Sequence, residues 1–234
     1  MKDKQVLERL RGRLIVSCQA LEHEAMYAPD RSLMGYFARA AAWGGAGGIR
    51  ANTVRDILAI REQVSLPVIG IIKQEYDGSD VYITPTMAEV DALCAIRCNV
   101  VAMDATARPR PGGAELAPFF AQCREKYPDQ LFMADCSTLE EGVRAAEMGF
   151  DVVSTTLAGY TAYTKGTVLP DLAMLKRLWQ ACDCFLIAEG GIWTPEQLAQ
   201  ALTAGADAAV VGTAITRPME ITRRFCAALE VHHA

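Results

Sequence analysis

The chain has 234 residues, of which 51% are hydrophobic and 22% are charged, and its formal net charge is −5. This length suits one barrel-sized domain, and the balance of apolar and charged residues is that of a globular protein. No apolar run reaches the roughly 18 residues of a membrane span, and an acidic chain with few basic clusters disfavours a nucleic-acid partner. We therefore expect one globular domain over residues 1–234 that binds neither membrane nor nucleic acid.

The N-terminal segment and the cysteines indicate the compartment. Residues 1–13 lack the apolar stretch and the cleavage site of a signal peptide. The eight cysteines are scattered, without a Cys-X-X-Cys pair or a histidine at ligand spacing. Reduced thiols fit this pattern better than disulfides or a zinc site. We expect a cytoplasmic protein without a metal centre.

Eight short apolar runs follow one another along the chain, and each ends in a polar or glycine-rich step. They are 14–16 before Ser17, 48–49 before Arg50, 68–72 before Lys73, 100–103 before Asp104, 131–134 before Asp135, 152–153 before Ser154, 185–188 before Glu189 and 208–211 before Gly212. Segments with helical spacing follow the runs in turn, at 33–43, 54–63, 87–96, 116–127, 139–148, 172–179, 195–203 and 220–229. This alternation predicts a parallel (β/α)8 barrel, here with a short N-terminal helix before it.

Helix start signals and long connections add detail to this prediction. Thr138 with Glu141 forms a capping box, and Thr194 precedes Pro195 as an N-cap before the first helical residue. The connections 74–86, 105–115 and 156–170 are long, which is typical of functional loops. The third carries Tyr160 and Tyr163, so it could cover a site and exclude water.

Two side chains at opposed strand ends suggest acid–base chemistry. In such a barrel the residues just past the C-terminal end of each strand face the substrate, and strands three and seven lie across the opening from each other. Lys73 follows the third run and Glu189 the seventh. Such a pair could remove a proton from one face of a carbon and return one to the other, although a salt bridge is the simpler alternative. Histidine chemistry loses support, because His232 and His233 lie at the C-terminus and His23 lies in a loop.

The last two strand ends favour a phosphate. Gly190 and Gly191 follow the seventh run, and Gly212 and Thr213 follow the eighth. This fold commonly binds phosphate there with loop N–H groups and a short helix N-terminus, and glycine lets the backbone approach closely. Arg217, just beyond, could add a charged contact.

Polar residues at the remaining strand ends are candidates for substrate contact. Gln19 and Arg50 follow the first and second runs and could orient hydroxyl, carbonyl or N-acetyl oxygens, and Thr155 after the sixth run is a further candidate for substrate contact. Ordinary polarity of the barrel rim is the alternative for each. Asp104 and Asp135 follow the fourth and fifth runs and complete the set of acid–base candidates.

Together these segments resemble the N-acetylmannosamine-6-phosphate 2-epimerase family of sialic acid catabolism. The matching stretches run in order through nearly the whole chain: LIVSCQAL at 14–21, PVIGIIK at 67–73, YITPT at 82–86, DAT at 104–106, RPRP at 108–111, ADCST at 134–138, STTLAGYT at 154–161, IAEG at 187–190 and VGTAITRP at 211–218. A set this dense is specific, unlike a lone glycine motif.

The resemblance implies a cofactor-free isomerase that interconverts N-acetylmannosamine 6-phosphate and N-acetylglucosamine 6-phosphate. It implies that Lys73 and Glu189 are the acid–base pair, that Asp135 and Arg50 are polar residues of the active site, and that Gln19 contacts the sugar. By the same resemblance, Arg217 and the glycine loops hold the phosphate and the protein forms a homodimer.

This chain departs from the family pattern at three positions. Gly191 stands where a basic residue is usual, Gln74 where arginine is usual, and Ala162 where proline is typical. The catalytic pair is untouched. Two other functions use the same features: a Schiff-base aldolase with Lys73 as nucleophile, or a sugar-phosphate-binding protein without catalytic activity.

Overall fold

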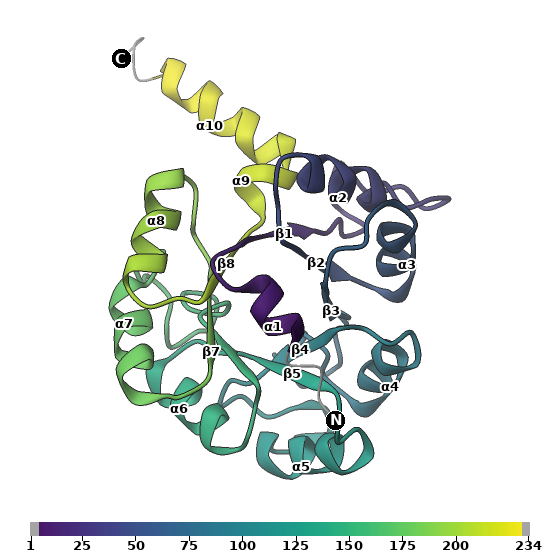
Figure 1. Cartoon of the computed structure of the whole chain (residues 1–234), viewed down its shortest axis with the longest axis vertical. Helices are drawn as coiled ribbons and strands as arrows, with labels where there is room; N and C mark the ends of the chain where they lie inside the picture. The colour runs from purple at the N-terminus through teal and green to yellow at the C-terminus, as the bar shows by residue number, and fades with distance from the viewer. Residues whose placement is uncertain (1–4, 231–234) are drawn as a thin grey trace.

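The computed structural model describes residues 5–230, which form a closed barrel of eight parallel strands (Figure 1). The strands are β1 Leu14–Cys18, β2 Gly48–Asn52, β3 Val68–Ile71, β4 Val100–Asp104, β5 Leu131–Asp135, β6 Val152–Ser154, β7 Phe185–Glu189 and β8 Ala208–Val211. The barrel closes where β1 pairs with β8, with Leu14 opposite Ala209. The predicted (β/α)8 fold is confirmed, while both ends of the expected 1–234 domain, with His232 and His233, lie outside the described residues.

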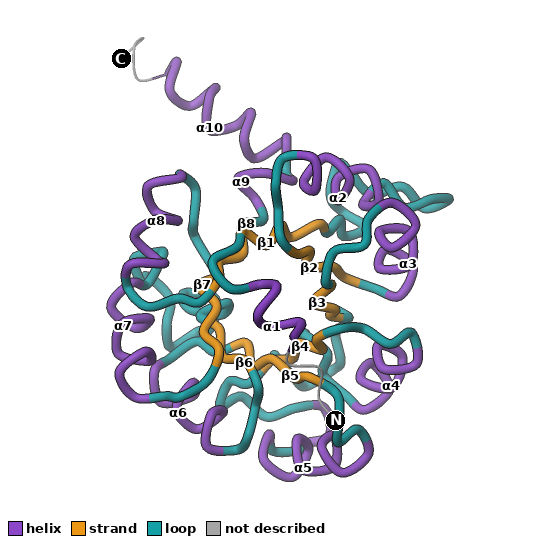
Figure 2. Tube along the Cα trace, in the orientation of Figure 1, coloured by secondary structure: helices purple, strands orange, loops and turns teal. Residues whose placement is uncertain are grey.

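Helices alternate with the strands and surround them (Figure 2). They are α2 Met34–Trp43, α3 Val54–Gln63, α4 Met87–Ala95, α5 Leu116–Lys126, α6 Leu139–Glu147, α7 Leu172–Ala181, α8 Pro195–Thr203 and α10 Pro218–Glu230, with the short α1 Gln5–Leu10, the 3-10 turn Pro111–Gly113 and α9 Thr213–Thr216. Thr138 and Thr194 cap α6 and α8 as the sequence predicts, and Thr86 forms a further capping box on α4. Among residues 5–230 no helix is both long and apolar enough to cross a membrane.

Side chains alternate between the two faces of each strand, and this alternation decides which residues reach the site. In β5, Leu131 and Met133 pack inside the barrel, whereas Phe132 and Ala134 pack outward with the helices. The inward series ends at Asp135, at the C-terminal mouth. Helix α1 packs its apolar residues on the inner cluster and lies across the barrel in Figure 1, so the N-terminal end is closed. Within residues 5–230, only the C-terminal end of the barrel is therefore left open for a cavity.

Helix α10 leaves the barrel instead of lying along it. In Figure 1 it projects away from the ring of helices, and its last residues end far from the sheet. Phe225 and Leu229 on this helix are 72% and 64% exposed. Near its middle, the Arg224 guanidinium stacks over the Trp193 ring at 4.0 Å. The predicted helix at the chain end therefore forms, but it does not take the place beside β8 that a regular repeat predicts.

Candidate active site

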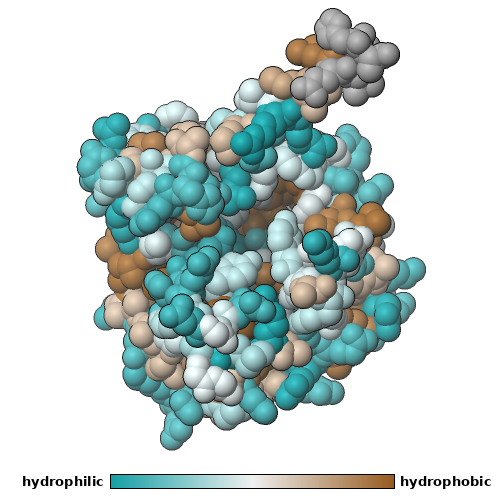
Figure 3. Space-filling model, turned by 180° about the vertical axis from the view of Figure 1, so that it is seen from behind, coloured by the Kyte–Doolittle hydropathy of each residue, from teal (hydrophilic) through white to brown (hydrophobic). Residues whose placement is uncertain are grey.

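A cavity of about 450 Å³ opens at the C-terminal mouth of the barrel. Figure 3 looks onto this face and shows it hollowed near its middle. Residues in or just past six of the eight strands line the wall, and β4 and β5 contribute none. Of the predicted site residues, the wall includes Gln19, Arg50, Lys73, Tyr160, Glu189, Gly190, Gly191, Gly212, Thr213 and Arg217. One end of the barrel thus brings together residues that lie up to about two hundred positions apart in the sequence.

Arg50 is the centre of a buried charge cluster. Its side chain is 1% exposed, and its two terminal nitrogens donate to both oxygens of Asp135 at 3.1 and 2.6 Å. The same guanidinium lies 3.3 Å from Glu189 Oε2. Two carboxylates from β5 and β7 therefore share one guanidinium from β2. A bidentate pair of this kind is strong and fixes the orientation of both partners.

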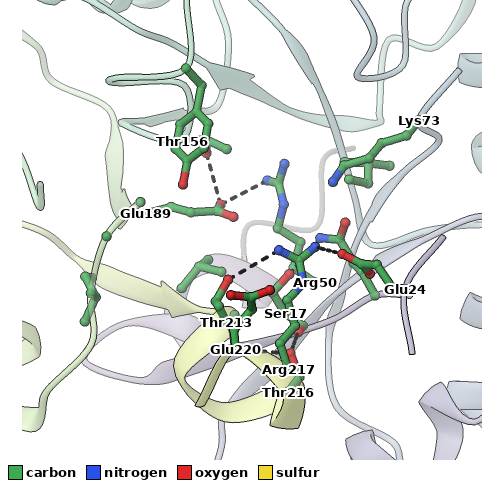
Figure 4. Close-up of a pocket in the computed structure, with 18 of the residues that line it drawn as sticks. Ser17, Glu24, Arg50, Lys73, Thr156, Glu189, Thr213, Thr216, Arg217 and Glu220 are labelled. Atoms are coloured by element: carbon green, nitrogen blue, oxygen red, sulfur yellow. Dashed lines mark hydrogen bonds and ion pairs between the residues drawn. The ribbon is translucent and has the colours of Figure 1, made fainter. Parts of the chain in front are cut away.

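Lys73 enters the cavity from the side opposite Glu189, with the Arg50 guanidinium between them (Figure 4). Its backbone is fixed, because its N–H donates to Asn52 Oδ1 at 2.9 Å and the residue pairs with Ile83 in an antiparallel bridge. Burial, followed by the positive charges of Arg50 and Arg217, lowers the pKa of Lys73 to about 8. An amine with such a pKa can exchange a proton near neutral pH.

Glu189 has a pKa shifted in the opposite direction. Burial raises the pKa of its carboxyl above the ordinary value, and Asp135 adds to the rise, whereas the Arg50 charge and a hydrogen bond from Thr156 oppose it. The Thr155 hydroxyl donates to the Glu189 carbonyl at 2.8 Å and accepts from its N–H at 3.1 Å. Environments that shift the pKa values of an acid and a base toward neutral pH are a feature of acid–base sites.

Three predicted contact residues lie behind the cavity wall. Asp104 is fully buried and pairs with Arg108 at 2.6 Å, since the loop after β4 folds back over it. Asp135 lies beneath Arg50, and Thr155 is turned toward the backbone of Glu189. None of these three side chains lines the cavity, and their contact with a substrate stays a prediction; Asp135 and Thr155 hydrogen-bond to Arg50 and Glu189, which do line it.

Sequence reasoning missed several residues of the wall. Ser17, Glu24, Tyr82 and Thr156 line the cavity, although none was a predicted contact. Thr156 is the most connected of them, with its hydroxyl 2.8 Å from Asp135 Oδ1 and 3.0 Å from Glu189 Oε2. Strand alternation was the available signal. The series Val152, Ser154, Thr156 points inward, so Thr156 and not Thr155 faces the cavity.

The end of the cavity near α9 carries the predicted phosphate residues. Gly212 precedes α9 as its N-cap, and Arg217 follows the helix. Arg217 Nη2 pairs with Glu24 Oε1 at 2.5 Å, and its other terminal nitrogen lies 3.4 Å from the Thr213 hydroxyl (Figure 4). A bound anion would therefore compete with Glu24 for this guanidinium.

Gln19 offers an acceptor to a ligand. Its Nε2 donates to the Ser17 hydroxyl at 2.7 Å, while its Oε1 is buried without a hydrogen-bond partner among residues 5–230. A buried polar atom without a partner costs free energy unless a ligand or water satisfies it. A hydroxyl or amide N–H of a substrate is the kind of donor that suits this oxygen.

Comparison with known proteins identifies the family. The sequence profile of the family described as "Putative N-acetylmannosamine-6-phosphate epimerase" matches residues 34–231. The chain belongs to this family. A protein of Enterobacter sp. (strain 638) named "Putative N-acetylmannosamine-6-phosphate 2-epimerase" is 53% identical over 98% of this chain and 97% of its own. One of the same name from Caldanaerobacter subterraneus is 51% identical over 94% and 92%. The resemblance inferred from the motifs is confirmed.

A solved structure agrees with this assignment. The N-acetylmannosamine-6-phosphate 2-epimerase from Clostridium perfringens matches with a TM-score of 0.89 and 49% identity, covering 95% of each chain. At this identity the likeness concerns the family as well as the fold. The cavity described above therefore lies in the barrel of an epimerase family member.

Both the backbone conformation and a close neighbour favour glycine at position 191 in this chain. The φ of Gly191 is +69°, in the left-handed region that favours glycine. A Cβ built on it would overlap the Cβ of Leu169 and lie 3.2 Å from two of that residue's backbone atoms. The loop after β6 therefore approaches this turn too closely for a side chain.

We predict that Gly191→Ala lowers the free energy of unfolding by about 2–5 kcal/mol, because a positive φ costs roughly 1–2 kcal/mol and overpacking a further 1–3 kcal/mol. Gly78→Ala is the matched control, since Gly78 has φ +76° with no atom within 4 Å of the added Cβ. Urea unfolding of both variants measures the difference. A loss at Gly191 equal to or smaller than that at Gly78 would contradict the steric explanation.

Proposed function

We propose that this epimerase family member interconverts N-acetylmannosamine 6-phosphate and N-acetylglucosamine 6-phosphate, with Lys73 and Glu189 moving the proton at C2. The observation that carries the proposal is the approach of these two groups from opposite sides of one cavity (Figure 4). The two sugars differ in configuration at one carbon. Inversion there needs a base on one face and an acid on the other.

The chemistry requires the open-chain form of the sugar. Only when C1 is an aldehyde does the C2–H bond become acidic, because the electron pair left on C2 is then delocalised onto the C1 oxygen. The guanidinium of Arg50 lies beside both Glu189 and the cavity, so it can stabilise the negative charge that develops on this oxygen. A donor held in place by two carboxylates needs little reorganisation when the charge forms.

The proton count of the pair determines when it can invert C2. With one proton, Lys73 is charged and Glu189 ionised, or both are neutral; either form has one base and one acid. With two protons the pair has no base, and with none it has no acid. The two active forms contain the same number of protons, so both reaction directions depend on the same state of the free enzyme.

The phosphate end of the substrate is proposed to lie beside α9. Arg217 supplies a guanidinium, and Gly190, Gly191 and Gly212 line the wall, where backbone N–H groups can approach phosphate oxygens. The phosphate would displace Glu24 from its ion pair with Arg217. For the proposed proton transfer, C2 must then lie between Lys73 and Glu189.

Two alternative functions from the sequence are less favoured. A Schiff-base aldolase would attack a carbonyl with the Lys73 amine, and reduction with borohydride would then trap a covalent adduct. A binding protein without catalytic activity would exchange no C2 proton. Family membership supports neither, since the matching relatives are named as epimerases.

A homodimer, a cytoplasmic location and a single domain over residues 1–234 stay predictions. Support for the homodimer comes from α10, which projects from the barrel with Phe225 and Leu229 exposed. A second copy that covers this face would remove both side chains from water, which favours association by the hydrophobic effect.

We predict that Lys73→Met and Glu189→Gln each reduce epimerisation by about 10²–10⁴-fold, the usual contribution of an acid–base group. A planar intermediate that is protonated only from the face that lost the proton returns to the starting sugar. Each variant should therefore retain slow C2 deuterium incorporation into one epimer in D2O, followed by NMR, and the two variants should favour opposite epimers. A folded Lys73→Met enzyme within tenfold of the parent rate would rule out the two-base scheme.

We predict that kcat/KM falls with rising pH above about 8, where Lys73 loses its proton and the pair can no longer return one to C2. This alkaline limb of the pH profile should be the same for both epimers, because both reaction directions need the Lys73–Glu189 pair to hold one proton. Initial rates with each epimer between pH 5 and 10 measure it. Undiminished activity up to pH 10, or different limbs for the two epimers, would show that Lys73 is not the titrating group.

A further inference from the structure

Thr156 lies where the two carboxylates of the site meet. Its Oγ1 is 2.8 Å from Asp135 Oδ1, 3.0 Å from Glu189 Oε2 and 2.6 Å from Ser154 Oγ, and Figure 4 shows it directed at Glu189. A hydroxyl carries one hydrogen, so it can donate to only one carboxylate at a time. The buried Ser154 hydroxyl can donate to Thr156, which leaves the Thr156 hydrogen for either carboxylate.

The two carboxylates differ in how firmly they are held. Asp135 is fully buried and receives hydrogen bonds from both terminal nitrogens of Arg50. Glu189 has one longer contact with that guanidinium, at 3.3 Å, and its side chain reaches the cavity. Asp135 therefore stays ion-paired with Arg50 throughout, whereas the charge of Glu189 changes if it takes a proton from C2.

We propose that Thr156 is a positioning residue whose hydroxyl turns toward Glu189 when that carboxylate is ionised and toward Asp135 when Glu189 has taken the C2 proton. The inference rests on the function proposed above for Glu189. In the step concerned, the C2–H bond breaks, its electron pair stays on the substrate as the enediolate, and the proton goes to Glu189. The O–H bond of Thr156 rotates and does not break.

The groups around Glu189 come from four strand ends. Arg50 from β2 and Lys73 after β3 favour its ionised form, whereas Asp135 from β5 disfavours it. Thr156, after β6, adds the hydrogen bond that favours the ionised form and lowers the pKa of the carboxyl. Loss of the hydroxyl should therefore raise the pKa of Glu189, so that the pair gains its second, inactivating proton at a higher pH.

The test compares variants that differ in this hydroxyl. Thr156→Val removes it at nearly constant volume, and Thr156→Ser keeps it. Thr167→Val is the matched control in the same connection, because the Thr167 hydroxyl donates to the Thr164 carbonyl at 2.7 Å and does not line the cavity. Thermal unfolding establishes that each variant folds, and the pH profiles of kcat and kcat/KM are then measured from pH 4.5 to 10.

Thr156→Val should move the acid limb of kcat/KM upward by about one pH unit and lower kcat roughly tenfold, the size expected for one hydrogen bond to a charged group. KM should change little. Thr156→Ser should keep the acid limb of the parent because it keeps the hydroxyl, and Thr167→Val should match the parent. The phosphate of the substrate titrates near pH 6 in every variant, so the difference between variants reports the enzyme.

An unmoved acid limb in Thr156→Val, or a Thr156→Ser enzyme as impaired as Thr156→Val, would overturn the inference. If Thr156→Val does not fold, Thr156→Ala removes the same hydroxyl without added apolar volume and is judged by the same limb. Glu189→Gln separates the two proposals. A Glu189→Gln enzyme that epimerises within tenfold of the parent rate would overturn the acid–base role proposed for Glu189, whereas its strong impairment beside an unmoved limb in Thr156→Val would overturn only the role of Thr156.

Discussion

The buried charge of Arg50 is the constraint on which the site depends. A guanidinium that is 1% exposed is stable only with carboxylates beside it, because an unpaired charge in the interior costs several kcal/mol. Asp135 meets this need with two hydrogen bonds, and Glu189 adds a contact at 3.3 Å. Since the three residues belong to β2, β5 and β7, satisfying one charge also fixes the relative positions of distant strand ends.

The same charge tunes the chemistry around it. Arg50 lowers the pKa of Lys73 and opposes the rise that burial causes in the pKa of Glu189. When the acid–base pair holds one proton, the charges of Arg50, Asp135, Lys73 and Glu189 sum to zero. Transfer of a proton from C2 leaves this sum unchanged once the enediolate is included. The reaction can thus proceed through the enediolate intermediate without creating net charge in a poorly solvated cavity.

The sequence predicts most of the fold because each strand is a short apolar run with a polar end, and the period-two alternation brings Arg50, Lys73 and Glu189 to the mouth. Features that depend on tertiary contacts cannot be read from the sequence. The pairing of Asp104 with Arg108 depends on how the loop after β4 folds back, and the departure of α10 from the barrel has no local signal. One further step of the same alternation selects Thr156, and not Thr155, as the residue that lines the cavity.

A crystal structure with an open-chain substrate analogue reduced at C1, a sugar alcohol phosphate that cannot form the enediolate, tests the central claim most directly. The account predicts that C2 lies between the Lys73 amine and the Glu189 carboxylate, with the two groups on opposite faces of the carbon. It also predicts the phosphate beside Arg217, with Glu24 displaced. Both groups on one face of C2, or Lys73 out of reach of the carbon, would contradict it.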